Sequence, residues 1–361
     1  MASAGPAGAT GCLLIQLGTP VSPSVRDVRR YLAQFLADPR VVDLPAPLRR
    51  LLLHGVILRI RPRRSAAAYR QIFGPEGSPL RVHGQALAEA VGRELGAGTR
   101  VELAMRYGEP SIATGVARLI ERGAARIAVI PLFPQRAASS TGSALAELYR
   151  AAARPFDVPP LRVADPFFDH PGFLDSVAEC IREAAGEWPP EHLLLSYHGL
   201  PERHVRRSGG PGCLEGPDCC EKPGARLARC YRAQCYATSR ALIRLLGLPA
   251  ERVTTAFQSR LGRTPWIRPY TDEVMASLAA RGVRRLLVAC PSFVADCLET
   301  LEEIGIRGAE RWRNLGGEEL RLAPCPNDRP RFASAVAEIA RGLGAGGPAG
   351  AEGAGPGVRE P

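Results

Sequence analysis

One histidine stands where a strand is expected to end. His198 follows the apolar segment 193–197, and Gly199 and Pro201 behind it favour a rigid turn. In open α/β sheets, ligands bind beyond the carboxyl ends of the strands, so this strand would direct the imidazole toward a ligand. An imidazole accepts protons near neutral pH and binds metal ions. The alternative stays open that the ring only hydrogen-bonds the backbone at the strand end.

Three carboxylates recur at helical spacing in a second segment. If a helix begins near Val294, Asp296, Glu299 and Glu303 stand at i, i+3 and i+7 and stack along one face. Acidic residues in a first helical turn also complement the helix dipole. That structural role does not account for a row two turns deep, so we predict a row of carboxylates that faces a cleft and passes protons or cations inward.

Cysteine is concentrated in a third segment. Of the 10 cysteines, five lie between positions 213 and 235, among many glycines and prolines: Cys213, Cys219, Cys220, Cys230 and Cys235. In a cytosolic protein such clustering indicates a metal site rather than disulfides. The spacing lacks the paired C-x-x-C of common zinc sites, and four thiolates are able to hold a [2Fe–2S] cluster. We therefore predict a metal site here, with iron–sulfur favoured over zinc.

Composition limits the class of protein. The 361 residues, 45% hydrophobic and 23% charged, are typical of a globular protein with two domains. The longest apolar stretch, 51–60, is interrupted by His54 and Arg59 and is shorter than the roughly 20 residues of a membrane span. No secretory signal is visible, so we expect a cytoplasmic protein. The net charge of +11 comes from scattered arginines, which favours anionic small molecules or an anionic membrane surface over nucleic acid.

The elements that must position these residues follow an α/β pattern. Short apolar runs alternate with longer amphipathic segments, as parallel strands alternate with helices. Strands are expected at 12–17, 101–106, 127–132, 193–197, 253–257 and 286–290. The segment 122–133 resembles 281–293, since each has a helix end, a glycine, an apolar run and then Pro and Phe. The chain is therefore predicted to form two similar α/β halves with a cleft between the carboxyl ends of their strands.

We predict the following division of the chain. Residues 1–11 form a disordered N-terminus, 12–160 an N-terminal α/β domain, and 161–327 a C-terminal α/β domain with a cysteine-rich loop at 209–230. Residues 328–342 form a terminal helix that packs back on the N-terminal domain, and 343–361 form a disordered tail.

An ordered set of motifs between about residues 13 and 327 resembles the ferrochelatase family. The motifs include the segment 30–42, Leu17-Gly-Thr-Pro20, Ser196-Tyr-His-Gly-Leu-Pro201, Phe257-Gln-Ser-Arg260 and Asp296-Cys-Leu-Glu-Thr-Leu-Glu-Glu303. The resemblance implies two Rossmann-like, chelatase-type domains, each a four-stranded parallel sheet flanked by helices, with a porphyrin in the cleft between them. It also implies a lyase of haem and porphyrin biosynthesis that inserts ferrous iron into protoporphyrin IX to make protohaem.

The resemblance assigns roles to particular residues. It places the metal-insertion site on His198 and Glu299, with His198 as the base or iron ligand. Glu303 and Asp296 would stand behind Glu299 as a relay for protons or metal. Seven further residues would pack on the macrocycle, line its pocket or meet its propionates: Leu17, Arg61, Tyr69, Ser78, Arg106, Phe133 and Trp266. Cys297 stands where several relatives have a histidine.

The cysteines of the loop would bind an iron–sulfur cluster without ligands from the C-terminus, as in some bacterial members of the family. Cys235 also occurs in relatives without a cluster, so the expected [2Fe–2S] ligands are Cys213, Cys219, Cys220 and Cys230, with Cys235 as the reserve.

Several alternatives remain at this point. The chain could be a non-catalytic haem or porphyrin carrier or an iron–sulfur sensor on a chelatase scaffold, or a chelatase for another tetrapyrrole such as coproporphyrin III. The leucine- and arginine-rich segment 47–62 is either an amphipathic lip of the cleft that touches a membrane or a helix packed on the core. The oligomeric state is left undetermined.

Overall fold

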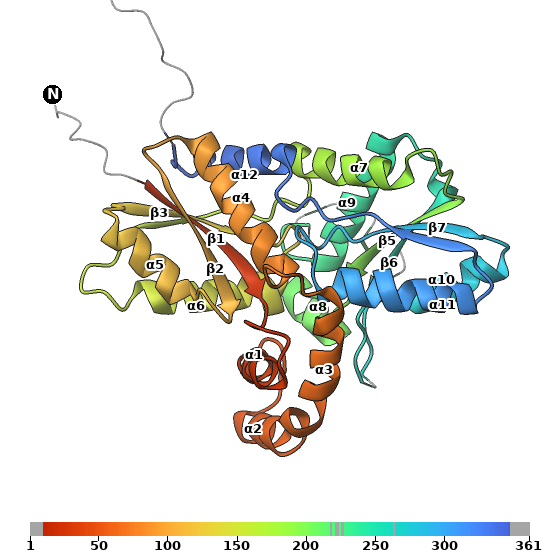
Figure 1. Ribbon diagram of the computed structural model, residues 1–361, viewed down its shortest axis with the longest axis horizontal. Coiled ribbons are helices and arrows are strands. Elements are labelled where there is room, and N and C mark those ends of the chain that lie inside the picture. Colours follow the sequence, from red (N-terminus) through yellow and green to blue (C-terminus); the bar gives the residue numbers. More distant parts are fainter. Residues whose placement is uncertain (1–9, 217–218, 221–223, 225–226, 263, 347–361) are drawn as a thin grey trace, which may run out of the picture.

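Two parallel sheets form the frame of the protein, in a computed structural model that describes residues 10–216, 219–220, 224, 227–262 and 264–346 (Figure 1). The first sheet has the order β2-β1-β3-β4 and the second β6-β5-β7-β8. The strands are β1 (Thr10–Gly18), β2 (Arg100–Tyr107), β3 (Arg126–Pro131), β4 (Leu161–Val163), β5 (His192–His198), β6 (Val253–Gln258), β7 (Arg285–Ala289) and β8 (Glu319–Leu322). Two parallel four-stranded sheets flanked by helices confirm the predicted fold class.

The sequence pattern located six of the eight strands that the structure describes. All six predicted strands correspond to strands of the two sheets, and β1 begins two residues early because Thr10 and Gly11 pair with β3. The outer strands β4 and β8 were not predicted. Each has only three or four residues and is at most half-buried, so neither produces the continuous apolar run by which a buried parallel strand is recognised.

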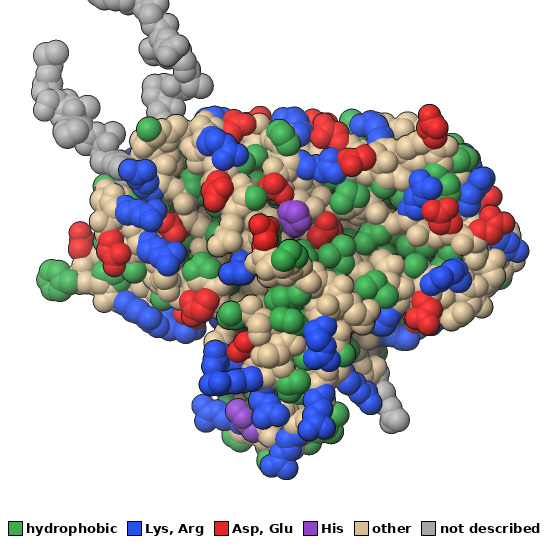
Figure 2. All heavy atoms as spheres, in the orientation of Figure 1, with side chains coloured by type: hydrophobic (Ala, Val, Ile, Leu, Met, Phe, Trp, Pro, Cys, Tyr) green, Lys and Arg blue, Asp and Glu red, His purple; other side chains and the backbone are tan. Residues whose placement is uncertain are grey.

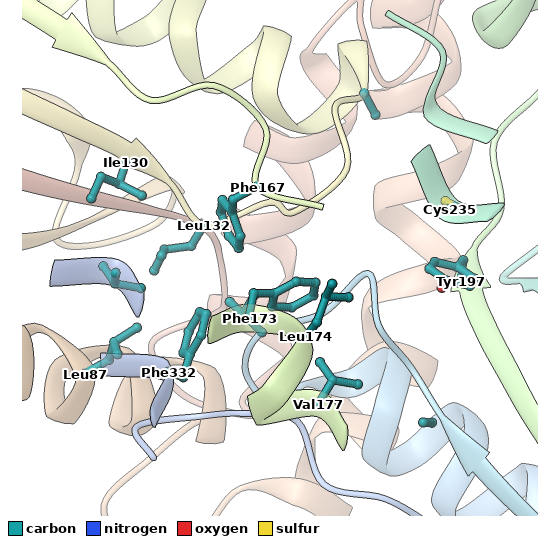
Figure 3. Packing of buried hydrophobic residues seen from close by; sticks show 14 of the residues in the cluster. Leu87, Ile130, Leu132, Phe167, Phe173, Leu174, Val177, Tyr197, Cys235 and Phe332 are labelled. Atoms are coloured by element: carbon teal, nitrogen blue, oxygen red, sulfur yellow. The ribbon is translucent and has the colours of Figure 1, made fainter. Parts of the chain in front are cut away.

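Helices cover both faces of each sheet. On one face, a continuous core joins the two sheets to α4 (Pro79–Leu95), α7 (Pro171–Ala185), α9 (Tyr231–Leu246) and α12 (Pro330–Gly342). Figure 3 shows Phe167, Phe173 and Phe332 packed together within this core, with Leu87 of α4 beside them. The opposite faces are covered by α5 (Ile112–Glu121) and α6 (Ser143–Ala152) on the first sheet and by α10 (Thr271–Ala280) and α11 (Ala309–Asn314) on the second.

A group of helices projects from this frame between β1 and α4 (Figure 1). It comprises α1 (Val25–Ala37), α2 (Ala46–Leu52), the π-helical turn η1 (Leu53–Ile57) and α3 (Leu58–Ile72). Its own small core includes Leu17 and Tyr107 of the first sheet and, from the other half of the chain, Leu298 and Leu301. The projecting helices therefore contact both halves. The remaining elements are η2 (Ala138–Gly142), α8 (Glu202–Gly209), η3 (Ala250–Arg252) and η4 (Leu298–Gly308).

The predicted domain boundaries stay predictions. The helix expected at 328–342 is present as α12, which lies against α4 and α7 (Figure 1). After it, Ala345 is buried and the Gly346 N–H donates to Thr99 Oγ1 over 2.9 Å. Residues 1–9 and 347–361 of the predicted tails, and 217–218, 221–223 and 225–226 of the predicted cysteine loop, lie outside the described residues. Among the described helices, none combines the length and apolar character that spanning a membrane requires.

Candidate active site

The end of β5 fixes the tautomer of His198. The ring nitrogen Nδ1 lies 2.6 Å from the carbonyl oxygen of Gly199. A carbonyl only accepts, so Nδ1 carries the proton, and the lone pair of the neutral ring resides on Nε2. The rings of Trp266 and Phe293 flank the imidazole at centroid distances of 6.4 and 6.2 Å. This arrangement leaves one nitrogen, Nε2, suited to accept a proton or bind a metal ion.

Glu303 faces this histidine from η4. Its two carboxylate oxygens accept hydrogen bonds from the backbone N–H and the hydroxyl of Ser259, each over 2.8 Å. Burial raises the pKa of Glu303, and the neighbouring carboxylate of Glu299 adds to this effect. The hydrogen bonds from Ser259 and positive charge on His198 act in the opposite direction. Glu303 is therefore close enough to His198 and to Glu299 for the charge of each to act on it.

Ser259 holds Glu303 from a strained position. Its φ of 65° lies in the left-handed region, which residues other than glycine rarely adopt. The preceding residue, Gln258, donates from Nε2 to the backbone oxygen of Glu299 over 2.7 Å. Backbone strain of this kind is found where surrounding contacts compensate for it, commonly at functional sites. No role was predicted for Ser259 or Gln258, although their place at the end of an apolar strand was a usable signal.

The projecting helices cover Glu299. Burial raises the pKa of Tyr31 and Tyr69 well above the ordinary value, and the negative charge of Glu299 contributes to both shifts. The two tyrosine rings meet edge to face with centroids 6.4 Å apart. Tyr69 was predicted at the site, but Tyr31 was not. The spacing of Tyr31 relative to the apolar residues of α1 is that of an ordinary core residue.

Asp296 does not belong to the carboxylate row, which corrects the sequence prediction. The helix starts at Leu298, with Cys297 as its cap, rather than near Val294. One oxygen of Asp296 accepts from Asn327 Nδ2 over 2.8 Å and the other from the N–H of Cys325 over 3.2 Å. Asp296 thus anchors the loop before α12. Glu299 and Glu303 remain on one face because four residues are roughly one turn of a π-helix.

Arg106 has a different partner from the expected propionate. Its guanidinium donates to Asp38 over 2.7 Å and to the hydroxyl of Ser143 over 2.7 Å, and lies 3.9 Å from Glu147. Burial opposes ionisation of Asp38, but the hydrogen bonds from Ser143 and the Arg40 N–H, together with the charge of Arg106, hold its pKa below the ordinary value. The sequence could not show this ion pair because its members come from three separate elements.

The other predicted porphyrin contacts are distributed around the site. Leu17 packs with the core of the projecting helices, and the buried Ser78 accepts a hydrogen bond from Thr19 over 2.8 Å. Phe133 packs with the core under α5 and α6. Within the described part of the chain, no ion pair or hydrogen bond engages the guanidinium of Arg61 on α3. Arg61 is thus the predicted arginine that remains available to a carboxylate.

Four cysteine sulfurs form one connected group. The Cys219 and Cys220 sulfurs lie 3.6 Å apart, and Cys230 shares hydrogen bonds with Cys213 and Cys220. Two thiolates on one tetrahedral metal, at bonds of about 2.3 Å, would be separated by roughly 3.8 Å. One pair of sulfurs thus has about the spacing of two thiolates on a single metal ion, and thiolates are the ligand type of iron–sulfur clusters. Over the described ranges, no three His, Cys, Asp or Glu side chains are yet arranged around a common point as a bound metal ion requires.

Cys235 lies outside this group. It is fully buried in α9, where its thiol interacts with Tyr231. The guanidinium of Arg232 donates to the sulfur of Cys220 over 3.0 Å, which places positive charge beside the four cysteines.

An ion pair joins the loop after α1 to α8. Asp43 accepts from Nε of Arg203 over 2.7 Å and also binds Nη2 of Arg203. Nε2 of His204 lies 3.1 Å from the same carboxylate. Because α8 begins just after the turn behind His198, this ion pair connects the projecting segment with the candidate site.

Replacement of Asp43 by asparagine should remove a pH-dependent part of the stability. Hydrogen bonds from Arg203 lower the pKa of Asp43 from 3.8 to about 2. Because the pKa is lower in the folded protein than in the unfolded chain, the ionised carboxylate stabilises the fold above about pH 4. This contribution, about 2 kcal/mol, is lost as the pH falls toward 2. The free energy of unfolding in urea should therefore be larger for the parent than for Asp43→Asn at pH 6. This difference should vanish near pH 2. The exposed Glu251→Gln is the control, and a difference that stays constant from pH 6 to 3 would contradict the assignment.

Comparison with known proteins gives one family. The sequence model of the ferrochelatase family matches residues 9–342. The chain is 52% identical to the ferrochelatase of Azotobacter vinelandii over 334 residues, which cover 91% of this chain and 97% of that protein. It is 47% identical over 332 residues to the ferrochelatase of Coxiella burnetii, covering 92% and 93% of the two chains.

The fold is also similar to solved structures of more distant sequence. The structure of SirB from Bacillus subtilis with Fe3+ superposes with a TM-score of 0.53 at 14% identity, covering 93% of this chain and 95% of that chain. The sirohydrochlorin chelatase SirB from Bacillus subtilis subspecies spizizenii in complex with cobalt gives 0.52 at the same identity and coverage. At this identity the similarity supports the fold alone.

Proposed function

The chain belongs to the ferrochelatase family of metal-inserting lyases, and from this premise we propose that its substrates are ferrous iron and protoporphyrin IX, with protohaem as the product. The observation that supports the proposal is the site itself. The charges of both His198 and Glu299 act on the carboxylate of Glu303, and the hydrogen bond of Nδ1 to Gly199 leaves the lone pair of His198 on Nε2. This is the combination of a base and an acidic relay that the reaction needs.

The chemistry follows from what insertion requires. Two pyrrole protons must leave the porphyrin and ferrous iron must lose its water. In our proposal, Nε2 of His198 accepts a proton or binds the entering iron, because Nδ1 is committed to Gly199. Glu303 is held by Ser259 and is close to both His198 and Glu299, and in this proposal the two glutamates pass protons or metal between the site and the outside. Leu17, Tyr69, Ser78 and Trp266 line the porphyrin pocket, and Arg61 meets a propionate.

An anaerobic absorbance time course tests the substrate. We expect the parent protein to convert protoporphyrin IX and ferrous iron to the haem spectrum, and to convert coproporphyrin III more slowly. Faster turnover of coproporphyrin III would overturn the assignment of the substrate. Porphyrin binding without conversion of either tetrapyrrole would instead support a non-catalytic carrier.

We also propose that Cys213, Cys219, Cys220 and Cys230 hold a [2Fe–2S] cluster. When bound, such a cluster supplies one-electron redox chemistry and fixes the segment that carries its ligands. The visible and electron paramagnetic resonance spectra of anaerobically purified protein test this. Cys213→Ser should lose the cluster spectrum and Cys235→Ser should retain it. Zinc in place of iron, or loss of the spectrum only in Cys235→Ser, would contradict the proposed ligand set.

We propose that the segment from α2 to α3 makes a peripheral contact with a membrane. This contact would place the protein at the cytoplasmic face of that membrane. Leu53 and Leu58 are buried in its core, whereas Leu51 is 70% and Ile60 is 59% exposed. Arginine side chains surround this segment on the projecting part of the surface (Figure 2). Apolar side chains within a basic collar favour an anionic bilayer.

Vesicle sedimentation tests this contact. With vesicles containing anionic lipid at low salt, Leu51→Glu combined with Ile60→Glu should weaken binding about tenfold or more, because apolar burial is lost and like charges face the membrane. Phe156→Ser removes an exposed apolar side chain elsewhere and should bind as the parent does. Failure of the parent to sediment at low salt would refute the contact.

A further inference from the structure

Tyr231 connects the cysteine group with His198. It is the first residue of α9 and follows Cys230, which caps that helix. Its side chain is buried, with 5% of the residue exposed, and its hydroxyl donates to the backbone oxygen of His198 over 2.7 Å. None of the sequence motifs drew attention to this tyrosine.

The backbone N–H and carbonyl of His198 need hydrogen-bond partners from side chains, because no neighbouring strand supplies them on the β7 side. The pairing of β5 with β6 continues to His198, opposite Gln258. The pairing with β7 ends at Leu195, opposite Ala289. On the β7 side, side chains take over: the N–H of His198 donates to the hydroxyl of Ser292 over 2.9 Å, and its carbonyl accepts from Tyr231. These two hydroxyls therefore set the direction in which the imidazole leaves the backbone.

The cysteine group holds Tyr231 from both sides along the chain. Cys230 before it shares hydrogen bonds with Cys213 and Cys220. Arg232 after it donates to the sulfur of Cys220 over 3.0 Å. Contacts with the cysteine group thus flank the tyrosine whose hydroxyl binds His198, at the first turn of α9.

We propose that Tyr231 is a positioning residue for His198 and transmits the arrangement of the cysteine group to it. This inference rests on the proposed function, since it gives the cysteine group a role in metal insertion. Tyr231 touches neither iron nor porphyrin in this proposal. It acts through the backbone of His198. Loss of the Tyr231 hydroxyl would therefore change the orientation of the His198 ring and leave the porphyrin pocket in place.

The first test compares two tyrosine-to-phenylalanine variants. Tyr231→Phe removes only the hydroxyl that binds His198. Tyr197→Phe is the matched control, because Tyr197 is also buried and its hydroxyl binds Ser239 over 2.9 Å instead of the backbone of His198. Tyr231→Phe should lower kcat about tenfold to a hundredfold, with the porphyrin KM within about twofold of the parent, because a small misplacement of a reacting group affects the chemical step. Tyr197→Phe should keep the kcat of the parent. Equal kcat values in the two variants would overturn the proposal.

The second test does not depend on turnover. The chain has 6 histidines, so a protein labelled only in its imidazole rings gives few signals, and the signal missing from His198→Ala assigns His198. Tyr231→Phe should shift that signal and Tyr197→Phe should not. Cys213→Ser should shift it as well, and the double variant Cys213→Ser/Tyr231→Phe should show less than the sum of the two shifts, since both act through one contact.

These outcomes separate this proposal from the proposed function. If the parent inserts no iron but the His198 signal responds as described, the proposed function fails and the positioning role stands. An unmoved signal in Tyr231→Phe refutes the positioning role. An unmoved signal in Cys213→Ser, or fully additive shifts, refutes transmission from the cysteine group.

Discussion

His198→Ala should abolish iron insertion while the protein still binds porphyrin. The change removes Nε2, which the hydrogen bond from Nδ1 to Gly199 leaves as the basic nitrogen of the site. Loss of a general base or metal ligand at the reacting centre costs about 10² to 10⁴ in rate. Porphyrin affinity should change little, because the residues that we propose to line the porphyrin pocket are other side chains. The anaerobic absorbance assay measures the first quantity, and a titration of porphyrin fluorescence measures the second.

A control histidine makes this result specific. His83 pairs with Asp328 over 2.8 Å between α4 and the loop before α12, so His83→Ala removes an imidazole outside the site. We expect that variant to insert iron at the parental rate. Full activity of His198→Ala would refute the assigned role of His198, and loss of porphyrin binding together with activity would show that His198 serves the pocket rather than the chemistry.

Glu303→Gln should lower kcat by about two orders of magnitude or more. Glutamine nearly preserves the shape of the side chain but cannot exchange protons, so a relay through this position would stop. Its Oε1 would still accept from the Ser259 N–H and its NH2 group would donate to the Ser259 hydroxyl, which also accepts, so the side chain should keep its place. The expected signature is a fall in kcat with the porphyrin KM little changed.

The neighbouring residue provides the matched control. Glu302 lies on the same π-helix, but its carboxylate accepts from Arg307 over 2.8 Å instead of facing Ser259. Glu302→Gln therefore removes the same charge from the same helix without touching the site. Equal losses of kcat in the two variants would mean that the helix as a whole, rather than the carboxylate of Glu303, is responsible. In that case Glu303 would have no place in a relay.

Local patterns determined much of this protein. Apolar runs closed by turn residues located three strands in each sheet and placed His198 at a strand end. The concentration of cysteines in 213–230 predicted a group of neighbouring thiols. In the structure, Cys230 shares hydrogen bonds with Cys213 and Cys220 within this group. Such features depend on residues close together in the chain, and local spacing is what a single sequence displays.

The tertiary structure decided which side chains meet. Asp296 lies only three residues from Glu299, yet it left the predicted row because Asn327 and the Cys325 N–H bind it. Arg106 pairs with Asp38, and Ser259, which follows β6, and Tyr231 of α9 bind Glu303 and His198. In each case the partners are separated by roughly thirty residues or more. Their contact depends on how the sheets and helices pack, and the periodicity of one segment contains no information about the donors that another segment brings to it.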